Sequence, residues 1–277
     1  MPFYRRLKAR LKADADWGAR YRRNLPAARR LAERVPLIHV CARKERTSFD
    51  ELFERDPPAL PTSADKGYYS EATRESEQGA ALGQCGYFYA GHAVDEFGEV
   101  ALGFDPVVER THTGSATPFD TGGLMGKPPR CINCQLTETP FPVRRRFVSR
   151  SRAPLAHWRK YFAHYVAAFF SAPEEYWTGR PAHDDPEMLF SRGRNNCRRA
   201  WIVEVRFHEP QPLDEVAAWC PSRQYMRLIQ KQVSRREPMT PGKSRLLAFL
   251  SSRHPLVPGG DLHYCRSIQE WAKGRSL

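Results

Sequence analysis

LAHWRKYFAHYVAAFF (residues 155–170) and RRAWIVEVRF (residues 198–207) decide the fold class of this chain. In the first stretch, apolar side chains recur every three or four residues, which is the period of an α-helix with one buried face. In the second, β-branched and aromatic residues alternate with charged ones, which is typical of a strand. A long amphipathic helix followed by a half-polar strand predicts an α+β fold.

Outward from these segments, the sequence predicts further strands and helices. Three short apolar runs bounded by Gly or Pro are expected strands: VPLIHVC (35–41), GYFYAG (86–91) and EVALGFDP (99–106). Helices are expected after Ser48, which has Glu51 at the capping-box spacing, from QPLDEVAAW (211–219), and over 243–253 and 266–273. Residues 107–142 show little periodicity, and they predict a long loop.

The length and composition predict one main domain with appendages. The chain has 277 residues, of which 41% are hydrophobic and 12% aromatic, enough for a substantial core. We expect a basic helical segment over 1–34, an α+β catalytic-like domain over 35–240 and a helical appendage over 241–277. No run is apolar enough to cross a bilayer or to act as a signal peptide, so a cytoplasmic protein is expected. Seven cysteines, an odd number, argue against a fully paired disulfide framework.

The charge of the chain is strongly positive. Lys and Arg total 44 against 31 Asp and Glu, a formal charge of +13, and eleven of the basic residues lie within residues 1–34 beside only three acidic ones. Two further basic clusters, at 143–152 and 192–199, lie near Trp158, Tyr161 and Trp201. Nucleic acid, a membrane surface or an acidic protein is a candidate anionic partner for such a chain. Aromatic residues interleaved with the basic ones favour nucleic acid. Solvated basic faces and a generally basic proteome are the alternatives.

Four residues on the expected strands are candidates for chemistry. Glu204 is an acidic residue in the apolar strand AWIVEVRF, and in a cleft its carboxylate would stabilise a sugar cation or activate a nucleophile. The alternative is an exposed strand glutamate paired with Arg206 or Arg199. His39, Tyr87 and Tyr89 lie on the early strands, where such residues are commonly packed in the core.

The segment PFDTGGL (118–124) is the other distinctive local sequence. Gly122 and Gly123 can expose backbone N–H groups to a phosphate or diphosphate, and Asp120 and Thr121 can bind a hydroxyl group. The alternative is a tight turn in which the Asp120 side chain caps Gly122. Neither a dinucleotide-binding GxGxxG nor a P-loop fingerprint is present.

Cys131 and Cys134 form a CxxC pair. A structural zinc site needs two further ligands at close spacing, and the other cysteines and His112 are scattered. A redox pair is disfavoured because no βαβ pattern surrounds it. We therefore expect no metal site.

LIHVC, SFDELF, GYFYAG and EVALGFDP follow one another along the chain, and AWIVEVRFHEPQPLDEV comes late. This order resembles the ADP-ribosyltransferase superfamily, most closely its nucleic-acid-modifying bacterial toxins. The resemblance implies a split mixed or antiparallel sheet with flanking helices, and NAD as substrate. It implies that His39 holds the NAD ribose, Tyr89 or Tyr87 stacks on nicotinamide, and Glu204 drives transfer. The expected NAD contacts are His39, Tyr87, Tyr89, Asp120, Thr121, Gly122 and Gly123.

The chain departs from the family pattern in two ways. His39-Val40-Cys41 stands where the family commonly has His-Gly-Thr or His-Val-Thr. No Gln-x-Glu or Glu-x-Glu precedes Glu204, which disfavours the subclass that modifies arginine in proteins.

Three functions compete on these grounds. The first is a toxin or antiviral defence effector that transfers ADP-ribose from NAD to DNA or RNA and has a possible antitoxin or other protein partner. The second is a non-enzymatic nucleic-acid-binding or partner-binding module. The third, a metal-dependent nuclease using Asp105 and Glu204, is disfavoured because no D…ExK pattern follows.

Overall fold

The structure of the chain is a computed structural model. The described residues are 2–41, 59–62, 85–93, 98, 100–104, 113–121, 140–178, 181–182, 201–213, 216–222, 263–264 and 268–276, with residues 74, 77, 78, 224, 225, 227, 231, 241, 244 and 245. The helix expected after Ser48, most of 243–253, residues Asp105, Gly122 and Gly123, the Cys131–Cys134 pair and the 192–199 cluster lie outside them.

The basic N-terminal segment is helical, as predicted, but it forms two helices. These are α1 (Pro2–Ala13) and α2 (Ala15–Arg34). Asp14 lies between them in an extended conformation, and its side chain accepts a hydrogen bond from the backbone N–H of Trp17 at 2.9 Å. An aspartate that caps α2 in this way satisfies one of the donors left open at a helix start.

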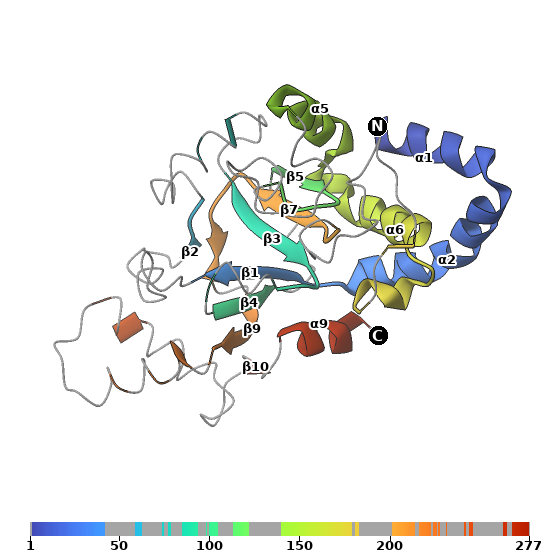
Figure 1. Cartoon of the computed structure of the whole chain (residues 1–277). Helices are drawn as coiled ribbons and strands as arrows, with labels where there is room; N and C mark the ends of the chain where they lie inside the picture. Colours follow the sequence, from blue (N-terminus) through green and yellow to red (C-terminus); the bar gives the residue numbers. More distant parts are fainter. Residues whose placement is uncertain are drawn as a thin grey trace.

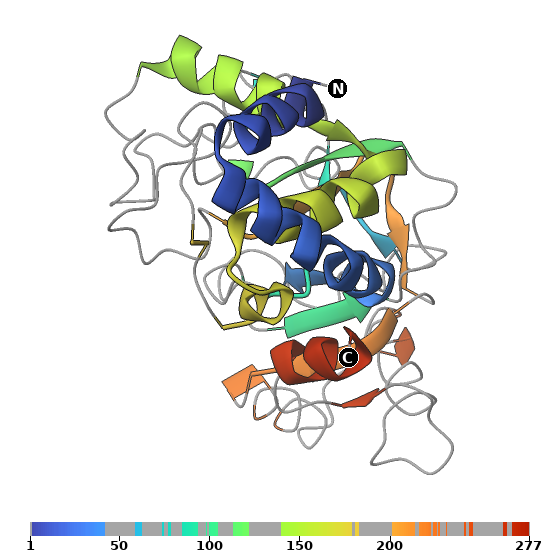
Figure 2. The same ribbon diagram turned by 90° about the vertical axis from the view of Figure 1, so that its right-hand side faces the viewer.

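The apolar side of α2 packs along α6 (Trp158–Phe169), which continues the short 3₁₀ turn η4 (Leu155–His157) (Figure 2). Together η4 and α6 confirm the helix predicted over 155–170. Asn24 of α2 donates to the carbonyl groups of Phe170 at 3.3 Å and Ser171 at 2.9 Å, and Arg159 of α6 donates to the carbonyl of Ala32. Further helical elements in the described part of the chain include α5 (Phe141–Ser151), η5 (Pro173–Tyr176) and α9 (Ile268–Ser276).

A mostly antiparallel open sheet forms the centre of the molecule (Figure 1). Its strand order is β10-β9-β4-β1-β3-β7-β5-β6, and only the β10–β9 pair is parallel. The strands are β1 (Leu37–Cys41), β3 (Gly86–Ala90), β4 (Val100–Phe104), β5 (Gly114–Thr117), β6 (Ala153–Pro154), β7 (Glu204–Phe207), β9 (Val216–Pro221) and β10 (His263–Tyr264). A separate pair joins β2 (Ala59–Leu60) to β8 (Gln211–Pro212). The fold class is therefore α+β.

The predictions for β1, β3, β4, β7 and α9 are confirmed, but the helix predicted from QPLDEVAAW is wrong. That segment contributes β8 and β9 instead. β9 pairs along β4, with Leu102 opposite Trp219 and Ala101 opposite Cys220. The backbone groups of this segment are satisfied by a neighbouring strand, and this tertiary pairing overrides a weak helical pattern.

The long loop predicted over 107–142 contains a regular strand, β5, so this prediction is wrong in part. β5 reads GSAT and lies between β6 and β7. Its residues are small and polar, so the apolar alternation that marks a strand in a sequence is absent. β5 is a strand because two neighbours pair with it.

The helices share one hydrophobic core with the sheet. Buried side chains of α1, such as Phe3 and Leu7, belong to the same apolar cluster as Phe88 of β3 and Ala272 of α9. Among the described residues, no helix is both long and apolar enough to cross a membrane.

Gly114 allows β5 to approach β7 closely. A Cβ atom at this position would lie 1.9 Å from the carbonyl oxygen of Arg206, which belongs to the backbone of β7 and cannot move aside. We expect Gly114→Ala to separate the two strands and to lower the free energy of unfolding by about 3 kcal/mol. Urea unfolding measures the change.

The control is Gly274→Ala in α9, because no atom of a described residue outside the backbone of that helix lies within 4 Å of a Cβ there. Alanine is the better helix former, so this variant is expected to be unchanged or more stable by up to about 1 kcal/mol. Equal unfolding midpoints for the two variants would contradict the close approach of β5 to β7.

Candidate active site on the polar face of the sheet

Strand register gathers polar side chains on one face of the sheet. In β7, Glu204 lies opposite Tyr89 of β3 and Thr117 of β5. Two residues further on, Arg206 lies opposite Tyr87 of β3 and Ser115 of β5. Cα partners in antiparallel strands direct their side chains to the same face, and residues two apart share it. These two rows therefore form a continuous polar surface, which we call the polar face.

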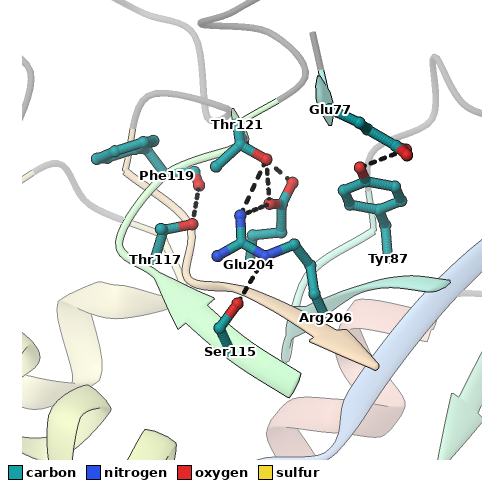
Figure 3. Close-up of polar contacts among 8 residues, drawn as sticks. All are labelled: Glu77, Tyr87, Ser115, Thr117, Phe119, Thr121, Glu204 and Arg206. Carbon is teal, nitrogen blue, oxygen red and sulfur yellow. Dashed lines mark hydrogen bonds and ion pairs between the residues drawn. The ribbon is translucent and has the colours of Figure 1, made fainter. Parts of the chain in front are cut away.

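The intervening residues of the same strands are apolar and point to the opposite face. Phe88 lies opposite Val205, and Val205 lies opposite Ala116. Leu155, at the start of η4, borders Gly114 on this apolar side. Helices thus cover the apolar face, whereas Figure 3 shows Tyr87, Ser115, Glu204 and Arg206 together on the other side.

The polar face is buried. Glu204 and Arg206 both have side chains that are 0% exposed, and their ion pair, Arg206 Nη1 to Glu204 Oε1, is 3.1 Å long. The alternative predicted from the sequence was an exposed Glu204 paired with Arg206. The pairing with Arg206 is confirmed, but the exposed position is wrong, because both side chains are buried. Arg199, the other expected partner, lies outside the described residues.

Thr121 binds Glu204 through two hydrogen bonds (Figure 3). Its backbone N–H donates to Oε2 of Glu204 at 3.2 Å, and its hydroxyl group donates to Oε1 at 2.6 Å. A side-chain hydrogen bond also joins Asp120 to Glu204. Two residues of the sequence-predicted PFDTGGL segment therefore contact the sequence-predicted glutamate, although 83 residues separate Thr121 from Glu204.

Burial raises the pKa of the Glu204 carboxyl group to about 8. The Arg206 guanidinium group opposes this shift, while the nearby Asp120 carboxylate strengthens it. A hydrogen bond between two carboxyl groups requires a proton on one of them, which agrees with a protonated Glu204 at neutral pH. A carboxyl group with a pKa near neutrality can accept and return a proton at physiological pH.

This raised pKa predicts how stability changes with pH. The folded protein holds the Glu204 proton up to about pH 8, while the unfolded chain releases it near the ordinary glutamate pKa of 4.5. Ionisation of Glu204 therefore opposes folding. The stabilising contribution is complete below the unfolded pKa and is lost as pH rises through the folded pKa. We expect the free energy of unfolding of the wild type, relative to Glu204→Gln, to fall by a few kcal/mol from about pH 5 to about pH 9. The free energy of unfolding of both proteins is measured at about pH 5 and about pH 9. An equal difference between the wild type and Glu204→Gln at the two pH values would contradict this prediction.

One nitrogen of Arg206 has no hydrogen-bond partner among the residues that the structure describes. Its Nε donates to Ser115 Oγ at 3.3 Å, and its Nη1 donates to Thr121 Oγ1 at 3.1 Å as well as to Glu204. Its Nη2 is buried and makes no hydrogen bond. An unpaired buried donor is costly, so it marks a position where a ligand oxygen would be bound favourably.

Two further basic residues, Arg152 and His208, lie near Arg206. Burial and then the charges of Arg206 and Arg152 lower the pKa of His208, and the Arg206 charge also adds to burial in lowering the pKa of Arg152. The guanidinium groups of Arg152 and Arg206 repel one another and favour an anionic ligand near them, whereas His208, with its lowered pKa, is neutral at physiological pH.

The two tyrosines of β3 lie beside this cluster. Tyr89 is buried opposite Glu204. The Tyr87 hydroxyl group donates to Glu77 Oε1 at 2.5 Å, and burial followed by the Glu77 charge raises the pKa of Tyr87 well above its usual value (Figure 3). Both tyrosines thus belong to the polar face.

His39 lies on the other face of the sheet. In β1, Ile38 is the Cα partner of Tyr89, so the next residue, His39, points away from the polar face. The His39 ring lies 5.1 Å from the Phe88 ring, and its Nδ1 donates to the Tyr87 carbonyl at 2.7 Å. The structure brings together Glu204, Tyr87, Tyr89, Asp120 and Thr121, and it separates His39 from them.

Glu77 and Ser115 were not identified from the sequence, and Arg206 was expected only as the partner of an exposed Glu204, not as a residue of the site. Arg206 had a usable signal, because residues two apart in a strand share a face and it follows Glu204 at that spacing. Ser115 belongs to the strand that the sequence did not reveal. Glu77 has no local pattern that separates it from other surface glutamates.

No group of three or more metal-binding side chains gathers within the described residues. Cys41, Cys85 and Cys220 are thiols rather than halves of disulfides. The site as described therefore consists of carboxyl, hydroxyl, phenol and guanidinium groups.

Fold and site together define an α+β protein with a buried acid–base cluster on one sheet face. No protein-family model, no curated protein and no solved structure matches the chain.

Proposed function

We propose that this protein is an NAD-dependent ADP-ribosyltransferase that modifies nucleic acid, in the manner of a toxin or a defence effector. The observation that supports the proposal most is Glu204, a buried carboxyl group held by Thr121 and Arg206 directly opposite Tyr89. Glutamate beside a strand tyrosine is the combination that the resemblance to this superfamily implies.

NAD would supply the ADP-ribosyl group: the bond from the ribose C1′ to the nicotinamide nitrogen breaks, nicotinamide leaves as a neutral base, and the acceptor bonds to C1′ as it loses a proton. Glu204 has two tasks in this reaction. Its carboxylate stabilises positive charge on the sugar, and it accepts the proton of the attacking group. The positive charge of the substrate favours the ionised form of Glu204, so binding offsets the raised pKa.

The residues around Glu204 bind and orient the substrate in this proposal. Tyr89 provides a ring for the nicotinamide, while the bonds from Thr121 hold the carboxylate in one orientation. The Nη2 group of Arg206, which makes no hydrogen bond to any described residue, donates to the diphosphate. His39 acts on this site through the Tyr87 carbonyl that it binds.

The decisive experiment uses the purified wild-type chain with NAD labelled in its adenine ring. Single-stranded RNA, single-stranded DNA and duplex DNA are tested separately as acceptors. We expect nicotinamide release and transfer of the label to at least one nucleic acid. Absence of nicotinamide release with all three acceptors would overturn the proposal.

A further inference from the structure

Two basic helices that are far apart in the sequence lie side by side. α1 and α5 contact each other at the end of the molecule that carries the N-terminus (Figure 2). α1 reads PFYRRLKARLKA and α5 reads FPVRRRFVSRS, so neither contains an acidic residue. The fold thus joins the N-terminal basic segment to the cluster at 143–152.

The charges of these helices point into solvent. The exposed basic residues, which we call the α1–α5 surface, are Arg5, Lys8, Arg10, Lys12, Arg145, Arg146 and Arg150. With no carboxylate on either helix, the positive charges repel one another, and an anionic partner relieves that repulsion.

Apart from Val143, the large apolar side chains described for the same helices pack in or against the core and are not available to a membrane. Phe3 and Leu7 of α1, and Phe147 and Val148 of α5, belong to the core. Among the described residues, the only large apolar side chain exposed is Val143, at 40%. Helices that lie on a membrane insert an apolar side into the lipid, and among the described residues this surface offers only the single side chain of Val143.

We propose that the α1–α5 surface binds the phosphate backbone of nucleic acid. Seven solvated cations over two adjacent helices suit a partner whose charges are close together and regularly repeated. That this partner is the acceptor of ADP-ribose rests on the function proposed above, whereas the binding itself does not. If all seven side chains contact phosphates of a duplex, the slope of log K against log salt concentration approaches about −6.

The test compares two variants that lose the same number of charges. The first replaces Arg145, Arg146 and Arg150 of α5 with Gln. The control replaces Arg227, Lys231 and Arg275 with Gln, which are exposed outside α1 and α5. Arg275 belongs to α9, which packs near β4 and β9 at one side of the sheet. The strand that follows α5, β6, forms the opposite edge of the sheet, so this control charge lies away from α5.

Binding to labelled 20-nucleotide RNA, single-stranded DNA and duplex DNA is measured by fluorescence anisotropy between 50 and 200 mM NaCl. The α5 variant is expected to bind on the order of tenfold more weakly, with a salt slope reduced by about 2 to 3. The control variant is expected to stay within about threefold of the wild type. Equal losses in the two variants, or no salt-dependent binding by the wild type, would overturn the proposal.

Two further measurements distinguish nucleic-acid binding by this surface from membrane binding and from the proposed enzymatic function. Sedimentation with vesicles containing phosphatidylserine tests the membrane alternative, and binding to vesicles without binding to nucleic acid overturns the proposal. Glu204→Gln is expected to bind nucleic acid as the wild type does. Binding without NAD cleavage would overturn the proposed function but support nucleic-acid binding by the α1–α5 surface. NAD cleavage together with equal binding by both charge variants would support the proposed function but overturn binding by this surface.

Discussion

Glu204→Gln is expected to reduce nicotinamide release from NAD at least on the order of a thousandfold, with the fold preserved. The amide has the size of the carboxyl group, and its single oxygen in the place of Oε1 still accepts from the Thr121 hydroxyl group and from Arg206 Nη1. It carries no negative charge to stabilise the sugar cation, and it cannot accept the proton of the acceptor. The loss should therefore appear in the rate of the chemical step and leave nucleic-acid binding unchanged.

The matched control is Glu33→Gln, the same chemical change at an exposed position of α2. Nicotinamide release is measured for both variants together with thermal melting, so that loss of activity is separated from loss of structure. Glu33→Gln should retain wild-type activity. An active Glu204→Gln protein would show that Glu204 does not carry the reaction.

The second large effect is expected in stability. Arg206→Met leaves the Glu204 carboxyl group buried without its cationic partner, and breaking a buried ion pair in this way costs about 3 to 5 kcal/mol. Loss of the guanidinium group also removes the influence that lowers the pKa of Glu204, so the pKa should rise further. Protonation then limits the damage at low pH. The variant should be destabilised more at pH 9 than at pH 6.

A double variant separates the charge effect from packing. Glu204→Gln combined with Arg206→Met removes both charges, so it should recover part of the stability that Arg206→Met loses at pH 9. Arg146→Met is the control, because Arg146 is exposed on α5, and it should change stability by less than about 0.5 kcal/mol. Equal destabilisation by Arg206→Met at both pH values would contradict the ionic role of the pair.

The elements that were predictable from the sequence carry their own apolar pattern. β1, β3 and β4 are short apolar runs between turn residues, and α6 repeats its apolar residues at helical spacing. β5 and β9 were missed because their strand structure depends on their neighbours rather than on their composition. The polar face shows the same limit: strand alternation identifies Glu204 and the two tyrosines as candidates, but not the strands that pair with them.

Residue order by itself determined the α+β class, the helical N-terminal segment, the excess of basic charge and the presence of a glutamate within a strand, because these properties arise from neighbours along the chain. The insertion of β7 between β3 and β5 depended on the folded structure, and it made Arg206, Thr121 and Tyr89 the surroundings of Glu204. The raised pKa of that glutamate and the contact between α1 and α5 are also tertiary properties. Burial and strand pairing join residues that are remote in the sequence, and a local pattern contains no record of which distant segment will supply the partner.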